Sequence, residues 1–402
     1  MKVLMLTPYL PFPPSSGGQI RTLNLLKYLS KNNEITLVSL YKFEKEKEYL
    51  SPLQKYCRQI YLCKRAEKPW QMGNIFRAIF SLQPFLVVRN FSQEAVTVLK
   101  DLLKNNQFDV IHAETFYIMP HLPKTKVPVI LVEQTIEYKV YQHFVHALPF
   151  FMRPFFYLDI LKLIYWEKHY WRKANLVAAV SESDSIRISQ VEPQVKPIIV
   201  PNGAGDEMLE APLVAKKLHN PKLLFIGNFF WLQNVEAATF LVSKILPLLK
   251  KLKINFQLII AGQNASNKLP FKEGKHLQII DIGPKDDFRV KKLYREATLF
   301  LAPIFGPGGT RLKILAAMAS ALPIIATKTG VDGLSLNDGE NVLIASTPQG
   351  FTDQVSRVLS DRKLYNKIQR ASYELVREKY SWQKIAMRLE DYYLQIKNEN
   401  RT

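Results

Sequence analysis

Short apolar segments alternate with longer helical patterns along the whole chain, and this alternation strongly limits the folds it can adopt. Buried strands that are separated by helices form parallel sheets, which helices then cover on both faces. We therefore predict an α/β fold with doubly wound parallel sheets. The predicted strands lie at residues 2–6, 34–40, 110–112, 128–132, 176–180, 197–200, 223–226, 257–261, 277–280, 299–303, 323–326 and 342–344.

The chain has 402 residues, which is too many for one ordinary core, so we expect two domains. Residues 191–197 are rich in proline, and residues 201–205 are rich in turn-forming residues, as is typical of a connector. The predicted domains are therefore residues 1–200 and 207–380, each with six of the predicted strands.

A glycine-rich turn in the second domain forms a candidate anion site. Residues 300–303 are an apolar run that stops before Gly308 and Gly309, and Thr310 is a suitable N-cap for a helix over residues 311–320. Free amides at the start of a helix bind anions, and glycines let a ligand approach the backbone closely. The pattern therefore favours a diphosphate as the ligand.

Two cations at the start of the same helix support this interpretation. Arg311 and Lys313 lie in the first predicted turn, where positive charge opposes the helix dipole unless an anion is bound. The alternative is an ordinary strand-to-helix turn, which would leave these two cations unexplained.

A second glycine pair precedes the first predicted helix of the chain. Gly17 and Gly18 lie between Ser16 and a helical pattern that begins near residue 19, and Arg21 follows one turn later. These residues could contact a phosphate or sugar from the first domain. For Arg21 the alternative is a solvated helix face.

The composition excludes several classes of function. The net charge of +20 favours anionic partners such as membrane lipid, nucleic acid or phosphorylated substrates, although a basic surface without a partner is the simpler alternative. We find no nucleic-acid-binding motif and no histidine pair with metal-ligand spacing, so we expect neither nucleic acid nor metal. The two cysteines, Cys57 and Cys63, form no disulfide framework, which suits a reducing cytosol.

The sequence predicts no signal peptide and no membrane span. The first apolar run, at residues 3–6, is too short for a signal core, and charged residues interrupt residues 148–166. Residues 138–173 and 68–89 nevertheless combine many aromatic side chains with lysine and arginine. Such a composition fits either the interface of an anionic bilayer or a helix packed on its own sheet. We therefore expect a cytoplasmic protein, with peripheral contact to an anionic membrane as one interpretation.

The glycine-rich turn also resembles a known family. The segment GPGGTRLKILAAM at residues 306–318 resembles the GGGTRLKILEAM signature of one branch of the GT-B glycosyltransferases of retaining family four. Leu312 matches the motif, and Ala316 occupies the position of its glutamate. Further matches to this family occur in the expected order at residues 1–21, 226–234, 331–334, 338–341 and 380–382.

The resemblance implies two Rossmann-like domains that face each other across a cleft, with the donor nucleotide on the second. It also implies that a helix at residues 381–397 returns to the first, acceptor-side domain. In this family no metal is needed, because cationic side chains and helix amides stabilise the leaving diphosphate. The residues assigned to the donor by resemblance are Gly17, Gly18, Arg21, Gly227, Asn228, Gly308, Gly309, Thr310, Leu312 and Ala316, with Arg311 and Lys313 as catalytic cations.

The sequence departs from the family pattern at three positions. Asn228 stands where much of the family has an arginine. Ala316 replaces a glutamate that accepts hydrogen bonds from the ribose, a loss of about 1.5–3 kcal/mol unless Glu340 or another group substitutes. Gln134 replaces a histidine after the fourth predicted strand, and glutamine cannot carry a proton. Glu133 or Glu137 could then act on the acceptor.

His112 lies at a predicted strand end, and we interpret it as a core histidine rather than a catalytic one. The resemblance as a whole implies a retaining glycosyltransferase that moves a sugar from a nucleotide donor to a glycan or lipid-linked acceptor. We keep three alternatives: a catalytically weakened GT-B-like subunit that binds a nucleotide sugar or a partner, a nucleotide-sugar epimerase on the same fold, and a nucleic-acid binder.

Overall fold

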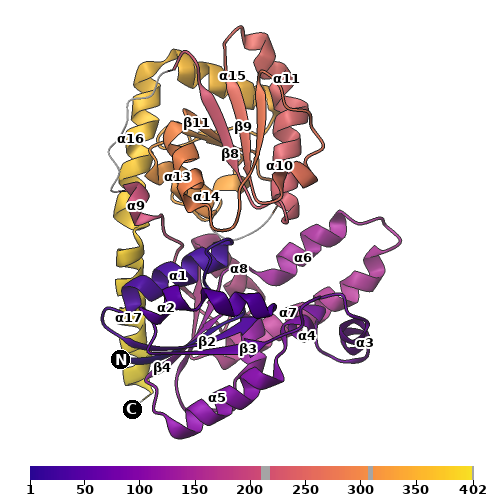
Figure 1. Cartoon of the computed structure of the whole chain (residues 1–402), viewed down its shortest axis with the longest axis vertical. Helices are drawn as coiled ribbons and strands as arrows, with labels where there is room; N and C mark the ends of the chain where they lie inside the picture. Colours follow the sequence, from indigo (N-terminus) through magenta and orange to yellow (C-terminus); the bar gives the residue numbers. More distant parts are fainter. Residues whose placement is uncertain (210–217, 307–310, 401–402) are drawn as a thin grey trace. The chain divides into compact units, whose positions relative to one another are not determined.

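The computed structural model describes residues 1–209, 218–306 and 311–400 of the chain (Figure 1). The chain divides into two compact units. Unit 1 contains Met1–Pro201 together with Ile385–Thr402, and unit 2 contains Asn202–Lys384. Each unit has its own parallel sheet and its own apolar core.

The sheet of unit 1 has seven strands, all paired in parallel. Its central strands are apolar and buried on both faces, because helices cover both sides. The order of the strands reverses between β1 and β4. Across the sheet the strands are β3 (Gln59–Lys64), β2 (Glu34–Tyr41), β1 (Lys2–Thr7), β4 (Val110–Glu114), β5 (Val129–Glu133), β6 (Leu176–Ala179) and β7 (Ile198–Ile199).

The helices of unit 1 begin where local side chains can satisfy free amides. Ser92 and Ser181 accept a hydrogen bond from the third residue that follows, and so cap α5 and α8. The α-helices are α1 (Gly17–Leu29), α2 (Ser51–Gln54), α3 (Met72–Phe80), α4 (Phe85–Asn90), α5 (Gln93–Asn105), α6 (Glu137–His146), α7 (Arg153–Lys173) and α8 (Glu182–Val191), with 3₁₀ turns at Glu44–Tyr49 and Phe116–His121.

The sheet of unit 2 has six strands, also paired in parallel. Here the order of the strands reverses between β8 and β11. Across the sheet the strands are β10 (Leu277–Asp281), β9 (Gln257–Gly262), β8 (Lys222–Ile226), β11 (Leu299–Ala302), β12 (Ile324–Ala326) and β13 (Leu343–Ile344).

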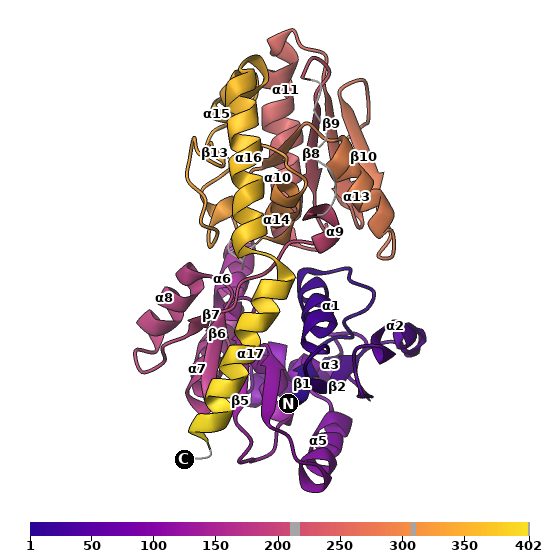
Figure 2. The same cartoon turned by 90° about the vertical axis from the view of Figure 1, so that its left-hand side faces the viewer.

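Helices cover both faces of this second sheet as well (Figure 2). Asp286, Thr347 and Asp361 cap α13, α15 and α16 through their side-chain oxygens. The α-helices are α9 (Asp206–Leu209), α10 (Leu232–Phe240), α11 (Leu246–Leu249), α12 (Ala265–Lys268), α13 (Asp287–Glu296), α14 (Leu312–Ala319), α15 (Pro348–Ser360) and α16 (Arg362–Lys379), with a π-helical turn at Leu241–Ile245 and 3₁₀ turns at Lys250–Leu252 and Thr329–Val331.

The last helix, α17 (Trp382–Glu399), contributes its residues from Ile385 onward to unit 1. Three polar contacts attach it there. The hydroxyl of Tyr393 lies 2.5 Å from Nδ1 of His112, Lys397 pairs with Asp109 at 2.8 Å, and Glu390 accepts hydrogen bonds from the amides of two asparagines after α1, Asn32 and Asn33. Leu389, Ile396 and the ring of Tyr393 are buried as well.

The predicted fold class, α/β with doubly wound parallel sheets, is confirmed. Each of the predicted strands is present, with bounds shifted by at most two residues. The exception is β3, which we did not predict. This strand lies at the edge of its sheet and is half-exposed, so its sequence QIYLCK lacks the apolar run of a central strand.

Candidate functional site

In each unit, the predicted site residues gather where the order of the strands reverses. In open α/β sheets, ligands bind at this point, beyond the carboxyl ends of the strands. In unit 2, Gly227 and Asn228 directly follow β8, and α14 follows the loop after β11. In unit 1, Gly17 and Gly18 follow the loop after β1 and begin α1.

Two glycines in unit 2 let neighbouring strand ends approach each other closely. Gly262 at the end of β9 has a φ of +148°, and a Cβ there would lie 1.7 Å from the carbonyl oxygen of Gly227. A Cβ on Gly227 would lie 2.9 Å from Cγ of Asn234. The backbone after β8 therefore requires glycine at both positions. The sequence pattern identifies Gly227 but not Gly262, whose only signal is a glycine at the end of an apolar strand.

Asn228 and Asn234 hold the loop after β8 in place. The side-chain oxygen of Asn228 accepts a hydrogen bond from the backbone N–H of Phe230 at 3.0 Å. The amide of Asn234, on α10, donates to the backbone carbonyl of Asn228 at 2.7 Å. Asn228 also donates to the side chain of Gln263 at 3.3 Å. The position where much of the family has an arginine is thus occupied by an amide that orders the loop.

Lys313 completes this network from α14. Its amine donates a hydrogen bond to the side-chain oxygen of Asn234, and it lies 4.9 Å from the centre of the Phe225 ring. Burial, and to a lesser extent the nearby charge of Arg311, lower the pKa of Lys313 to about 7. Because its polar partner is a neutral amide, the ammonium is under-compensated, and an anion bound here would stabilise it.

The start of α14 differs by one residue from the prediction. The helix begins at Leu312, and Arg311 is its N-cap with an extended backbone, so Arg311 precedes the first turn. The guanidinium of Arg311 donates to the carbonyl of Gly306 at 2.6 Å. Leu312 and Ala316 are half-buried against the core of unit 2. Three predicted residues, Gly308, Gly309 and Thr310, lie outside the described residues.

In unit 1, Gly18 and Gln134 are brought together by a tyrosine that we had not singled out. A Cβ on Gly18 would lie 1.9 Å from the hydroxyl of Tyr9 and 2.5 Å from the side-chain oxygen of Gln134. The amide of Gln134 donates to that hydroxyl at 2.8 Å and to the carboxylate of Glu114 at 2.5 Å. Gln134 therefore links the ends of β4 and β5 to the loop before α1.

Arg21 is fully buried, which fits neither of its two expected roles as a phosphate ligand or as part of a solvated face. Its Nε lies 3.6 Å from the carboxylate of Glu114, and its Nη1 donates to the carbonyls of Val200 and Pro201 at 3.1 and 2.9 Å. Arg21 therefore acts as a structural cation in the core of unit 1. A helical pattern could not show this, because the partners come from distant parts of the sequence.

His112 is the core histidine that we expected. It is buried, and its two ring nitrogens contact Glu114 at 2.9 Å and the hydroxyl of Tyr393 at 2.5 Å. Burial alone would raise the pKa of Glu114, but Arg21 and His112 outweigh it and keep that pKa below its ordinary value. Glu114 is thus an ionised carboxylate at the centre of a buried polar network.

Glu137 lies in a different group of carboxylates at the start of α6. Burial raises the pKa of Glu137 to about 7. Burial together with neighbouring carboxylates also raises the pKa of Glu133 and of Glu167. Glu167 accepts hydrogen bonds from the backbone amides of Glu137 and Tyr138 at 2.7 and 3.1 Å. A carboxyl group that titrates near neutral pH can serve as a general base.

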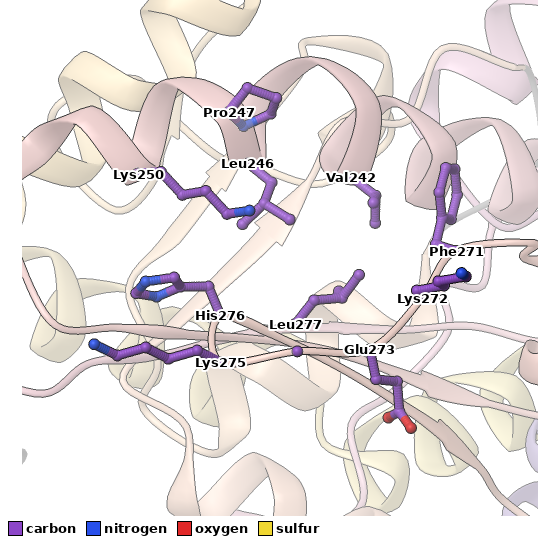
Figure 3. Close-up of a pocket in the computed structure, with 11 residues that line it drawn as sticks. Val242, Leu246, Pro247, Lys250, Phe271, Lys272, Glu273, Lys275, His276 and Leu277 are labelled. Atoms are coloured by element: carbon purple, nitrogen blue, oxygen red, sulfur yellow. The ribbon is translucent and has the colours of Figure 1, made fainter.

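A pocket of about 390 Å³ lies elsewhere in unit 2 (Figure 3). Figure 3 shows Lys250 and His276 on facing sides of it, between the end of α11 and the start of β10. It contains none of the predicted site residues and lies at the amino end of its strand, whereas ligands of such sheets bind at the carboxyl ends. We therefore do not assign the donor to it.

In the described part of the chain, no three histidine, cysteine, aspartate or glutamate side chains are grouped so that they could hold a metal ion. Across the same residues, no helix combines the length and the apolar character that crossing a membrane requires.

The fold is shared with solved glycosyltransferases of the GT-B class. Sucrose-phosphate synthase from Thermosynechococcus elongatus matches with a TM-score of 0.72 at 14% identity, over 98% of this chain and 99% of the other. Anabaena HepE, solved in complex with UDP, matches with a TM-score of 0.67 at 12% identity, over 98% and 100%. The two units therefore have the GT-B fold.

Sequence comparison finds a matching family model and several relatives. Residues 220–361 match the family model of glycosyl transferases group 1. An uncharacterised 44.6 kDa protein in the cps region of Klebsiella pneumoniae is 22% identical over 96% of this chain and 97% of its own length. Phosphatidyl-myo-inositol mannosyltransferase of Mycobacterium leprae is 24% identical over 54% of this chain and 58% of its own. Within a chain that has the GT-B fold, residues 220–361 are thus similar to glycosyl transferases group 1.

Proposed function

We propose that the protein transfers a hexose from a nucleotide-sugar donor to a glycan or lipid-linked acceptor, with retention of the anomeric configuration. The observation that carries the proposal is the network of Lys313, Asn234 and Asn228 at the reversal point of the second sheet. It places an under-compensated amine where ligands of such sheets bind. Solved structures of the same fold contain UDP or UDP-glucose, which supports a nucleotide-sugar donor.

In the proposed reaction, the bond between the anomeric carbon and the diphosphate oxygen breaks, and the acceptor oxygen bonds to the same face of the sugar. Lys313 and Arg311 would stabilise the charge of the leaving diphosphate, together with the backbone amides of Gly308, Gly309 and Thr310. Preorganised cations and amides can supply this stabilisation without a metal ion.

The remaining predicted residues have supporting roles in this proposal. Gly227 and Asn228 would shape the donor side, and Gly17 and Gly18 would offer backbone amides to the donor at the start of α1, where Tyr9 fills the space beside Gly18. Gln134 would orient a sugar hydroxyl. The proton of the acceptor hydroxyl would pass to the leaving phosphate or to Glu137, whose pKa is suited to a base at neutral pH.

The acceptor is proposed from the relatives. One of them is encoded in a cps region, and another is a phosphatidyl-myo-inositol mannosyltransferase. We therefore propose a role in cell-envelope polysaccharide or glycolipid synthesis, with unit 2 binding the donor and unit 1 the acceptor. The chain would act in the cytoplasm at the inner face of the plasma membrane.

The alternative is a catalytically weakened nucleotide-sugar-binding subunit. The motif branch with Gly-Gly-Thr-Arg-Leu-Lys usually carries a glutamate where this chain has Ala316, and a histidine where it has Gln134. Ala316 has no group that can bind a ribose hydroxyl, and Gln134 already hydrogen-bonds Tyr9 and Glu114. These two positions are the observations that favour the alternative.

A panel of UDP- and GDP-sugars tests the proposal. We expect slow donor hydrolysis by the wild-type protein and transfer to a lipid-linked acceptor, with the anomer of the product read by NMR. Arg311→Ala should lose donor affinity and rate together, whereas Arg362→Ala, at an exposed arginine at the start of α16, should not. Donor binding without turnover would favour the alternative, and wild-type kinetics for Arg311→Ala would remove its cationic role.

A further inference from the structure

Large apolar side chains are exposed on one part of unit 1. On α3, Met72, Phe76, Ile79 and Phe80 each expose more than half of their surface, and Phe80 exposes 81%. Their spacing places them along one side of the helix. The buried residue of this helix is Ala78. The apolar face of α3 is therefore turned toward solvent, the reverse of an ordinary surface helix.

The long helix α7 has a second apolar face of the same kind. Phe155, Leu158, Leu161 and Tyr165 recur every three or four residues, and each exposes more than 60% of its surface. The opposite side of α7 is buried in the core of unit 1 through residues such as Leu163. One side of the helix therefore packs on the core of unit 1, as one interpretation of the sequence expected, and the other side exposes apolar side chains.

The two exposed faces belong to one continuous surface. The amine of Lys162 on α7 donates to the carbonyls of Ala78 and Ser81, at 2.7 and 2.8 Å, at the end of α3. The indole of Trp166 donates to the carbonyl of Leu82 at 2.9 Å. Figure 1 shows α3 and α4 beside α7 in this unit. We call the exposed faces of α3 and α7, with the turn before α7, the α3–α7 surface.

The charges on these segments are almost all positive. Residues 68–89 and 138–173 contain nine lysines and arginines but two acids, Asp159 and Glu167. Both acids are engaged by the protein itself, because Asp159 accepts a hydrogen bond from the amide of Phe85 and Glu167 is fully buried. The acids directly before the two segments are Glu67, which pairs with Lys64, and Glu137, which is half-buried. Two of the cations, Lys168 and Arg172, pair with Glu192, and the remaining cations leave the apolar faces flanked by net positive charge.

We propose that the α3–α7 surface docks on an anionic lipid bilayer, with the apolar faces of both helices at the level of the headgroups. A water-facing apolar patch of this extent marks an interaction site. An anionic bilayer has negatively charged headgroups over an apolar interior. Aromatic and aliphatic side chains can enter the apolar region, while the flanking lysines and arginines contact the headgroups. A second copy of the chain would bring like charges together, which opposes pairing through this surface.

Vesicle flotation tests this proposal without requiring catalysis. Wild-type protein should float with vesicles that contain phosphatidylglycerol, and much less with pure phosphatidylcholine or at high salt. Phe80→Ser with Phe155→Ser should reduce partitioning at least about tenfold, because two exposed apolar side chains no longer enter the interface. The matched control is Phe288→Ser on α13 of unit 2, since Phe288 is also 79% exposed.

Three outcomes would overturn the proposal. They are the absence of flotation at low salt, unchanged flotation of the Phe80/Phe155 variant, and equal loss in the Phe288 control. A dimer that forms in solution and disappears in the Phe80/Phe155 variant, without vesicle binding, would instead assign the surface to a second copy. The docking proposal and the proposed function can fail independently of each other. The Phe80/Phe155 variant should hydrolyse a nucleotide sugar as fast as the wild type in solution without vesicles, even if it no longer binds vesicles.

Discussion

At the scale of single residues, the charge of Lys313 depends on what occupies the space beside it. Its amine is buried against the Phe225 ring and bonded to a neutral amide, so in the free protein its pKa is about 7. A bound diphosphate would stabilise the ammonium and raise that pKa again. Proton uptake by one lysine therefore becomes a signature of donor binding.

We predict that the affinity for UDP-glucose falls as the pH rises above 7. Above pH 7, a growing fraction of the free protein has a neutral Lys313. Because binding the donor then requires Lys313 to take up a proton, the affinity should fall by up to about tenfold per pH unit. Titration calorimetry in buffers of different ionisation enthalpy measures both the affinity and the proton uptake. Lys313→Met should bind weakly and without this pH dependence.

The matched control is Lys363→Met, because Lys363 is an exposed lysine on α16 of the same unit. It should keep the wild-type affinity and pH profile. A wild-type affinity that is constant between pH 7 and 9, with no proton uptake, would contradict the role assigned to Lys313.

At the scale of elements, the sequence predicted the helices and strands better than the contacts between them. Apolar runs identified the central strands because burial on both faces requires them, as for β8 and β9. The same reasoning could not detect the contact of Gly262 with Gly227, since it depends on how two strand ends come together. It also could not show that Tyr9 and Glu114 would surround Gln134, which lies 125 and 20 residues away from them in the chain.

We predict that Gly262→Ala severely destabilises unit 2. Its positive φ disfavours any side chain, and the new methyl group would meet the backbone of Gly227, which cannot move aside as a side chain could. The expected cost is at least about 3 kcal/mol in the free energy of unfolding. Urea denaturation followed by circular dichroism measures it.

Gly283→Ala provides the comparison, because no heavy atom lies within 4 Å of a Cβ built at Gly283. This variant should unfold within about 1 kcal/mol of the wild type. Equal stability of the two alanine variants would show that the strand ends are less closely packed than described.

At the scale of the whole molecule, the two units should respond to pH in opposite directions. In unit 1, burial raises the pKa of Glu133 to about 8 and that of Glu167 well above its ordinary value, so at neutral pH the folded unit binds more protons than the unfolded chain. Its stability should fall as the pH rises past neutrality. In unit 2, Lys313 has a pKa of about 7 when folded, and this pKa returns to its ordinary value on unfolding, so the unfolded chain binds one more proton. The stability of unit 2 should therefore rise as the pH rises past neutrality.

Between pH 7 and 9 we predict changes of up to about 1.4 kcal/mol per pH unit for each such group, with opposite signs in the two units. Burial lowers the pKa of His121 in unit 1 to about 4. Above about pH 6.5 this histidine is neutral in both the folded and the unfolded chain, so it does not change the stability between pH 7 and 9. Hydrogen exchange by mass spectrometry, corrected for the intrinsic rate, resolves the two units.

Two variants check the assignment of these slopes. Glu133→Gln should flatten the profile of unit 1, and Lys313→Met should flatten that of unit 2, each without affecting the other unit. If the stability of both units changed in the same direction with pH, the predicted opposite responses would be wrong.

The attachment of α17 to unit 1 has a consequence for synthesis. Tyr393 and its neighbours cover His112 and Asp109, yet they are translated after the whole of unit 2. Unit 1 therefore emerges first from the ribosome but can complete its fold only after the whole of unit 2 has been made. A released chain truncated before residue 385 should contain a folded second half and an incomplete first half that protease digests readily.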